Sequence, residues 1–376
     1  MWFDDLFGFS ESTGSGYDAT RARFEMTSDG YLLCASAPAS SGGGKMFVGA
    51  FETPTLAELL DRARGSDPDA PASSLGGVRF AHLADPVGVE SLIRDASNAG
   101  AVFQAASQFN CLEMVGPNVT PKAGVTNYFH DNTQGPKCAL ACPAGTVFRN
   151  YFAGPDRARG QGGEQIDCLA GVAAVVRARA PPVPWKMKNG YALPLASDGK
   201  LLPPDSNLYR GGGVKGPASP MGALSAKLAS DAALRRECEL ALRVGVHWET
   251  SVKPPAAHRV AQVYASAVPV AYAKCVPSGE WEGFARMVLN AAYEATLAAA
   301  AAIARERKTE RVPVFLTALG GGAFGNRVEW IVDAVNAALE TFKDAPLDVK
   351  LVHHGSVVKS QYKNGIKEKK KRKKPE

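Results

Sequence analysis

The sequence lacks the features that mark secreted and membrane proteins. It opens on Met1-Trp2-Phe3-Asp4-Asp5, which is acidic, whereas a signal peptide begins with basic residues. Its alanine-rich run, Ala291 to Ala304, contains Glu294 and is followed by Arg305 and Arg307. These charges are typical of an amphipathic helix rather than of a membrane span. We therefore expect no leader and no contact with a membrane.

The chain also lacks a general excess of positive charge. The formal net charge is +6, but residues 359–376 hold nine Lys and Arg against Glu368 and Glu376, and so carry +7. The rest of the chain is close to neutral at −1. This balance gives the body of the protein no basic surface of the kind that nucleic-acid binding requires. The 376 residues are 45% hydrophobic, enough for one large core or two ordinary ones.

The cysteines also do not indicate a disulfide framework. The seven cysteines are odd in number and lie mostly in apolar runs, so we expect them reduced and buried, in a cytosolic or nuclear protein. Cys138 and Cys142 form the one close pair, and no second Cys/His pair stands nearby. A place in the core explains this pair better than a metal site does. We predict neither a metal nor a cofactor.

A glycine-rich stretch near the end of the chain stands out instead. The sequence VPVFLTALGGGAFGNRVEW, from Val312 to Trp330, has an apolar run followed by Gly320, Gly321, Gly322 and Gly325. Apolar residues then recur at helical spacing, so the order predicted is buried strand, glycine loop and helix. Such a loop exposes backbone N–H groups to which a phosphate or diphosphate can bind, although tight packing of a helix on a strand also selects glycine.

The common nucleotide-hydrolysis and dinucleotide motifs do not fit this stretch. Asn326 and Arg327 stand where a P-loop has Lys and Ser or Thr. The stretch also lies near the chain's end, not at the first strand of a dinucleotide-binding unit. No GxSxG motif or evident Cys–His pair indicates nucleophilic catalysis.

A second stretch of the same kind lies in the first half of the chain. The predicted strand over 101–106 continues into SQFNCLEM, Ser107 to Met114, and then into a long polar loop that reaches Gly135. Pro136 suits the first turn of a helix, for which Thr133 is a plausible N-cap. Loops of this length in a compact domain are usually functional. We predict a second anion-binding helix N-terminus here.

Strands and helices alternate through the second half of the chain, which predicts an α/β fold with helices on both faces of the sheet. The fold class expected is a three-layer α-β-α arrangement with a mixed central sheet. We expect a flexible arm over 1–27, one domain over 28–358 with an insertion near 196–222, and a basic disordered tail over 359–376.

The order of these elements resembles the macrodomain family and its poly(ADP-ribose) glycohydrolase relatives, chiefly over 262–355. LTALGGGAFGN is similar to the second phosphate loop of that family, and FARMVLNAAYEATLAAA to the helix before it. The resemblance implies a macrodomain-like fold and binding of ADP-ribose. It assigns the ligand to Gly320, Gly321, Gly322, Ala323, Phe324, Gly325 and Asn326 in one loop, and to Asn110, Thr133, Gln134 and Gly135 in the other. Two departures are the absence of a glycine triplet in the first loop and of the paired glutamates of the glycohydrolases.

Hydrolysis of an ADP-ribosyl linkage would require a carboxyl group, and Glu113 and Asp131 are the candidates. Glu113 lies in an apolar setting in which burial would raise its pKa, and its alternative role is a bond to a neighbouring backbone N–H. Asp131 is equally suited to an Asx turn. The alternatives to a hydrolase are a catalytically inactive reader of ADP-ribose and a scaffold whose glycine loops are only structural.

The chain ends in a dense basic tract, KEKKKRKK, from Lys367 to Lys374. Such a run is solvated, and it is typical of a nuclear-import signal or of a contact with a polyanion. It would suit ADP-ribosylated macromolecules or an import receptor as partners, although a merely solubilising tail is the alternative. The localisation expected is nuclear or cytoplasmic.

Overall fold

A mixed seven-stranded sheet forms the centre of the protein. The structure, a computed structural model, describes residues 1–42, 44–65, 75–203, 219–308 and 310–367. In spatial order the strands are β4 (Phe51–Glu52), β9 (Gly245–Ser251), β10 (Arg259–Ala265), β6 (Val102–Ala106), β11 (Val312–Thr317), β12 (Leu347–His354) and β5 (Arg79–Asp85). The five strands from β10 to β5 run parallel, whereas β9 pairs antiparallel with both β10 and β4. The predicted α/β class with a mixed sheet is confirmed.

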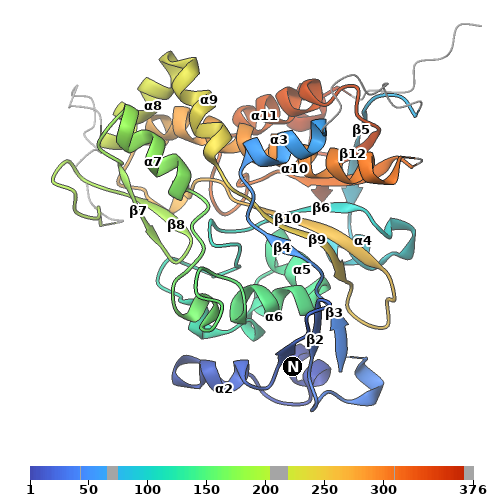
Figure 1. The fold of residues 1–376 in the computed structure, drawn as a ribbon. Coiled ribbons are helices and arrows are strands. Elements are labelled where there is room, and N and C mark those ends of the chain that lie inside the picture. The colour runs from blue at the N-terminus through green and yellow to red at the C-terminus, as the bar shows by residue number, and fades with distance from the viewer. Residues whose placement is uncertain (43, 66–74, 204–218, 309, 368–376) are drawn as a thin grey trace, which may run out of the picture.

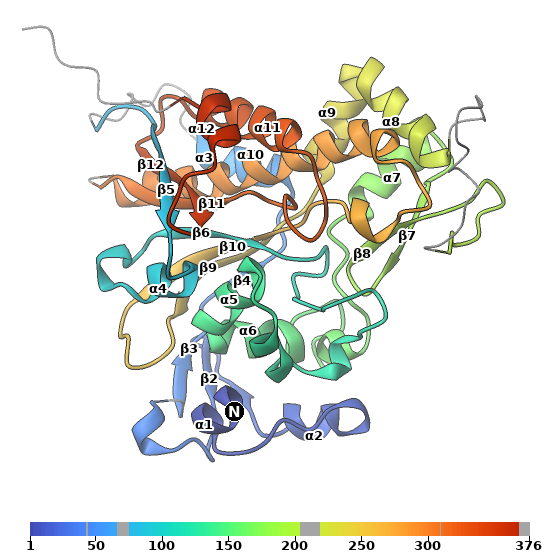
Figure 2. The same cartoon turned by 180° about the vertical axis from the view of Figure 1, so that it is seen from behind.

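Helices cover both faces of this sheet (Figures 1 and 2). On one face, α10 lies against β10, β11 and β12 and contacts the other helices of its layer. On the opposite face, α5 packs on β6 and α6 packs on β9. The helices of the first layer are α3 (Leu56–Arg64), α8 (Pro220–Ser230), α9 (Ala232–Ala241), α10 (Glu282–Arg307) and α11 (Val328–Thr341), with α7 (Ala170–Arg179) beside α9; those of the second are α4 (Val89–Arg94), α5 (Gln134–Ala141) and α6 (Pro143–Tyr151).

Helix α10 is mostly buried, whereas the sequence predicts an amphipathic helix. Residues 278–307 are apolar and long enough to cross a membrane by length and composition alone, yet 94% of the most apolar window is buried inside the fold. Small alanine side chains let the helix lie close to the sheet and to its neighbouring helices at the same time. Near the middle of α10, two guanidinium nitrogens of Arg236 donate to the Glu294 carboxylate at 2.6 and 2.9 Å. This ion pair compensates for the Glu294 charge in an apolar setting.

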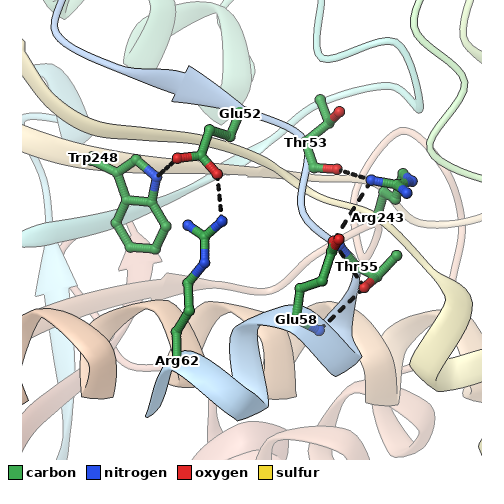
Figure 3. A network of polar contacts seen from close by, with 7 residues as sticks. All are labelled: Glu52, Thr53, Thr55, Glu58, Arg62, Arg243 and Trp248. Carbon is green, nitrogen blue, oxygen red and sulfur yellow. Dashed lines mark hydrogen bonds and ion pairs between the residues drawn. The ribbon is translucent and has the colours of Figure 1, made fainter. Parts of the chain in front are cut away.

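Several local signals in the sequence are confirmed. The Thr-x-x-Glu pattern of Thr55 and Glu58 is typical of a capping box, and Thr55 begins α3 with one. Glu58 N–H donates to Thr55 Oγ1 at 3.2 Å, and Thr55 N–H donates to the Glu58 carboxylate at 2.7 Å (Figure 3). Arg243, which lies just before β9, donates to the Thr53 carbonyl beside this cap and so joins α3 to the sheet edge. The Asn189-Gly190 pair, a sequence typical of a two-residue hairpin turn, joins β7 (Trp185–Lys188) to β8 (Tyr191–Pro194).

Two stretches with continuous helical periodicity, 136–152 and 225–241, each form two helices instead of one. Pro143 ends α5 and starts α6, because a proline has no N–H to donate to the preceding turn. Asp231 separates α8 from α9, since its carboxylate accepts the Leu234 N–H at 2.9 Å and caps a new helix.

The N-terminal residues are not the flexible arm that their composition suggests. They form α1 (Trp2–Phe7) and α2 (Tyr17–Arg21), followed by a small antiparallel sheet of β1 (Glu25–Met26), β2 (Tyr31–Leu33) and β3 (Lys45–Phe47). Phe3 and Phe7 are fully buried. Together with Tyr17 they belong to a second hydrophobic cluster that includes side chains of α5 and α6, some 130 residues later in the sequence. Burial of these aromatic rings fixes the segment to the domain.

The C-terminal segment also differs from the prediction. The expected tail from residue 359 begins instead with helix α12 (Ser360–Gly365), which packs beside α11 (Figure 2). Tyr362 and Ile366 are buried, so the chain is held as far as residue 366. Residues 368–376, and residues 204–218 of the predicted insertion, lie outside the described part of the chain. The roles of the basic tract in nuclear import and polyanion binding therefore stay predictions.

Candidate functional site

A cleft of about 750 Å³ lies beyond the carboxyl ends of β6, β11, β12 and β5. Open α/β sheets bind ligands at this edge, because the loops after parallel strands converge there. The cleft is lined by the ends of β5 and β6, the start of α5, the loop after β11, the end of β12 and α12. The two predicted anion-binding stretches, near residues 134 and 321, both belong to this lining.

The glycine loop after β11 forms one wall of the cleft. Gly320 has φ +70°, which turns the chain, and the loop is closed by bonds from Gly321 N–H to the Ala318 carbonyl and from Asn326 N–H to the Gly320 carbonyl, both 2.9 Å. The next three amides behave differently. Within the described residues, no acceptor contacts the N–H groups of Gly322, Ala323 and Phe324, all of which line the cleft. Consecutive free amides of this kind form an anion-binding concavity.

Buried groups hold the glycine loop in place. Tyr293 of α10 donates to the Thr317 carbonyl at 2.7 Å and accepts the Leu319 N–H at 2.9 Å. On the other side, Asn326 donates to the Val268 carbonyl at 2.8 Å. Asn326 is 4% exposed and does not line the cleft, and neither does Gly325. The resemblance assigned both residues to the ligand, but the structure places them behind the loop, where they support it.

The start of α5 forms the facing wall. Thr133, Gln134 and Gly135 line the cleft, and Thr133 makes no side-chain cap to the helix. The N–H groups of Gln134 and Gly135 have no acceptor among the residues described, as is usual for the first turn of a helix. The helix dipole adds a partial positive charge at this end. Two sets of free amides, from two distant parts of the sequence, thus line one cleft.

Side-chain bonds fix α5 to the end of β6. The Gln134 amide extends the sheet, because it accepts the Ala106 N–H and donates to the Gln104 carbonyl, both at 2.8 Å. Gly135 approaches β6 so closely that a Cβ there would lie 1.8 Å from the Ala106 carbonyl oxygen and 2.3 Å from Glu113 Oε2. Only glycine fits at this position, and it brings the helix N-terminus against Glu113.

Glu113 is a buried carboxyl group at the α5 end of the cleft. It is 2% exposed, and its Oε1 has no hydrogen-bond partner in the described chain. Burial raises its pKa well above the ordinary value, with a smaller contribution from the Asp131 charge, while the Arg149 guanidinium and the Ser107 hydroxyl act in the opposite direction. A carboxyl group whose pKa is raised in this way keeps its proton to higher pH than an exposed one, which suits a general acid.

Asp131 lines the cleft but has a structural partner. Its Oδ1 accepts the Thr133 N–H at 2.8 Å, which makes the Asx turn that leads into α5. The turn uses one carboxylate oxygen of Asp131 and leaves the other, Oδ2, outside the turn.

Asn110 does not reach the cleft. It is fully buried, its amide donates to Gln165 at 2.9 Å, and its Oδ1 accepts the Leu112 N–H at 3.2 Å. Cys111, with φ +61°, reverses the chain after Asn110, and the residue that the turn presents to the cleft is Glu113. The ligand role assigned to Asn110 by the resemblance is therefore not supported by its position.

Asp85, at the end of β5, is a lining residue that sequence reasoning missed. Its Oδ1 accepts the N–H groups of Val87 and Gly88, at 3.3 and 3.0 Å. Its Oδ2 is buried and unpartnered within the described structure. The only sequence signal was an Asp that ends an apolar strand and is followed by Pro86 and Gly88.

Helix α12 closes the same end of the cleft with Lys359 and Tyr362, a contribution that the sequence did not indicate. Two histidines secure it. His82 Nε2 lies 2.9 Å from the Ile366 carbonyl and His82 Nδ1 lies 3.0 Å from His353 Nε2. Because a carbonyl only accepts, His82 carries its proton on Nε2, and His353 Nε2–H then donates to His82 Nδ1. Burial lowers the pKa of His353 to about 4, and the neighbouring His82 and Lys359 act in the same direction, which keeps His353 neutral in this arrangement.

Comparison with known proteins gives structural similarity only. No protein-family model matches the chain, and no curated protein matches its sequence. The chain is similar to poly(ADP-ribose) glycohydrolase from Deinococcus radiodurans in complex with ADP-ribose, with 10% identity over 84% of this chain and 94% of that one and a TM-score of 0.38. It is also similar to poly(ADP-ribose) glycohydrolase from Thermomonospora curvata bound to the inhibitor ADP-HPD, with 11% identity over 94% and 100% of the chains and a TM-score of 0.36. At these TM-scores, the function proposed below rests on the cleft of this chain.

Proposed function

We propose that the cleft binds ADP-ribose or a related nucleotide diphosphate and that Glu113 promotes hydrolysis of a glycosidic bond at the distal ribose. The observation that supports binding is the pair of free amide sets, Gly322 to Phe324 and Gln134 to Gly135, in one cleft. Backbone amides at loops and helix N-termini are the groups with which proteins hold diphosphates.

The spacing of the cleft's polar groups fits a ligand of this length. Asp85 ends β5 and Glu113 follows β6, and the sheet order places β12 and β11 between these two strands. Three interstrand steps of about 4.8 Å separate the two strands by about 14 Å. The glycine loop follows β11, between the two carboxyl groups. A base at Asp85, a diphosphate at the glycine loop and a second sugar at Glu113 would occupy the cleft in that order.

Asp85 suits the base end because its unpartnered Oδ2 can accept a hydrogen bond from an exocyclic amine such as that of adenine. Leaving this buried oxygen without a donor is unfavourable, so a ligand that supplies one gains affinity.

Glu113 suits the reacting end. In its protonated form it would donate to the leaving oxygen as the bond from that oxygen to the anomeric carbon breaks. The sugar then passes through an oxocarbenium-like state, and water attacks the anomeric carbon and returns a proton to the Glu113 carboxylate. The products are free ADP-ribose and the protonated leaving group.

A catalytically silent reader is the second candidate. Glycosidic hydrolysis commonly uses two carboxyl groups. Among the described residues at this end of the cleft, Glu113 is the one deeply buried carboxyl, and Asp131 is already bonded to the Thr133 N–H. The lack of a free second carboxyl group favours a reader. A role of the glycines in packing alone is opposed by Gly322, at which an added Cβ would meet nothing within 4 Å.

Calorimetric titration with ADP-ribose tests the binding function. We expect saturable 1:1 binding, and absence of heat at millimolar ligand would refute it. Release of ADP-ribose from a modified protein then separates hydrolase from reader. Turnover that is lost in Glu113→Gln supports the hydrolase, whereas binding without turnover in the unaltered chain identifies a reader. Turnover that persists in both Glu113→Gln and Asp131→Asn would contradict the catalytic assignments.

A further inference from the structure

The N-terminal segment forms the support on which the Glu113 loop rests. Leu112 and Met114, the two neighbours of Glu113 in the sequence, are buried in the same hydrophobic cluster as Phe3 and Phe7 of α1. The side chains on either side of Glu113 in the sequence thus pack with residues from the start of the chain, while Glu113 itself lines the cleft.

Glu11 makes the polar part of this support. Its carboxylate accepts the Val125 N–H at 2.8 and 2.9 Å, the Thr126 N–H at 2.7 Å and the Tyr151 hydroxyl at 2.7 Å. Gly124, with φ +73°, makes room for it, because a Cβ there would lie 2.4 Å from the carboxyl carbon of Glu11. The loop is therefore built around this carboxylate, in the way that a backbone concavity encloses an anion.

The backbone of Thr126 is held at both its N–H and its carbonyl. The N–H donates to Glu11, and the carbonyl accepts the indole N–H of Trp2 at 3.0 Å. Thr126 begins the short 3-10 helix over Thr126–His130, which carries Tyr128. The Tyr128 hydroxyl accepts the backbone N–H of Glu113 at 3.0 Å, and the Tyr128 ring is 3% exposed. A continuous series of contacts thus runs from Glu11 through Thr126 and Tyr128 to Glu113.

We propose that Glu11 is a positioning residue for the reaction: through Tyr128 it fixes the backbone of Glu113 and thereby the place of the carboxyl group in the cleft. This inference rests on the proposed function. Glu11 itself does not line the cleft, and it acts on the rate rather than on ligand binding. Misplacement of a reacting group by about 1 Å can lower a rate about 100-fold. The diphosphate amides are held independently of Glu11, because Gly322 to Phe324 lie on another segment and the Gln134 side chain fixes the start of α5 to β6.

The test is Glu11→Gln, with Glu25→Gln as the matched control. An amide at position 11 keeps the size of the side chain but directs an NH₂ group at the donors of Val125 or Thr126, which then lose their acceptor. Glu25 lies on the same N-terminal segment and is exposed in β1, so the same chemical change there should have no effect.

For Glu11→Gln we expect kcat for ADP-ribose release to fall 10- to 100-fold, while the Kd of ADP-ribose stays within about threefold of the unaltered chain. The Glu113 amide should exchange its hydrogen faster, and the pH profile of kcat should shift as the Glu113 carboxyl changes its surroundings. Near-UV circular dichroism at the assay temperature should show the same folded fraction in both variants.

Unchanged kcat in Glu11→Gln would overturn the inference and leave the proposed function intact. A fall in kcat that is matched by weaker ligand binding or by a smaller folded fraction would also overturn it, since Glu11 would then be merely structural. Absence of turnover in the unaltered chain would instead refute the hydrolase and this inference together.

Discussion

Replacement of Gly322 by valine separates ligand binding from packing in the glycine loop. An added Cβ at Gly322 would meet no atom within 4 Å, and its backbone does not require the left-handed conformation. The free energy of unfolding should therefore change by no more than about 0.5 kcal/mol. The new side chain would occupy the space over the free amides of Gly322, Ala323 and Phe324.

The effect on affinity follows from the hydrogen bonds that a diphosphate would lose. A bond to a charged acceptor contributes about 1.5 kcal/mol or more, so loss of two costs about 3 kcal/mol, or about 100-fold in Kd. Calorimetric titration with ADP-ribose and urea unfolding measure the two quantities. Gly116→Val is the control, because Gly116 is equally open but does not line the cleft.

Two results would refute this reasoning. Binding by Gly322→Val within twofold of the Gly116→Val control would show that the loop does not hold the diphosphate. A loss of several kcal/mol in unfolding free energy would show that the glycine is needed for packing.

Three further predictions concern other parts of the account. Glu113→Gln should lower turnover about 100-fold or more. Because burial raises the folded-state pKa of Glu113, the unaltered chain should lose stability as the pH rises above the ordinary value of 4.5. Glutamine does not titrate, so the unfolding free energy of the variant, measured in urea, should rise relative to that of the unaltered chain over this range. Asp85→Asn should reduce the preference for ADP-ribose over its inosine analogue about tenfold by competition binding, since the analogue has a carbonyl in place of the amine; an unchanged preference would remove Asp85 from the base site. Phe7→Ala should cost about 3–5 kcal/mol in urea unfolding because the ring is fully buried, and a loss below 1 kcal/mol would mean that the N-terminal segment is only loosely attached after all.

Features with local causes could be predicted from the sequence. The glycine loop between β11 and α11 follows from an apolar run, a glycine cluster and helical periodicity within about thirty residues. The cap at Thr55 and the hairpin at Asn189-Gly190 depend on even shorter patterns. Short local patterns indicate these elements, so they can be predicted before the tertiary contacts that hold them are known.

Features that depend on distant contacts could not be predicted. The N-terminal residues have the composition of an arm, and their aromatic rings find partners only because α5 and α6 lie beside them in the fold. Asp85 and Tyr362 reach the cleft because β5 pairs with β12 at the sheet edge, a pairing that periodicity does not reveal.

The position of Asn110 outside the cleft has a different cause. The strand was predicted correctly, but the left-handed conformation of Cys111 in the turn after it decides which side chain lines the cleft. Non-glycine residues adopt this conformation rarely, and nothing in the sequence around position 111 indicates it.

Glycine-selective ¹⁵N labelling with titration of ADP-ribose tests the central claim most directly, since the claim is that two distant loops bind one ligand. The account predicts that the amide signals of Gly135, Gly321 and Gly322 shift together with a single Kd, while that of Gly116 does not move. Shifts confined to one of the two loops, or no shifts at millimolar ADP-ribose, would contradict it.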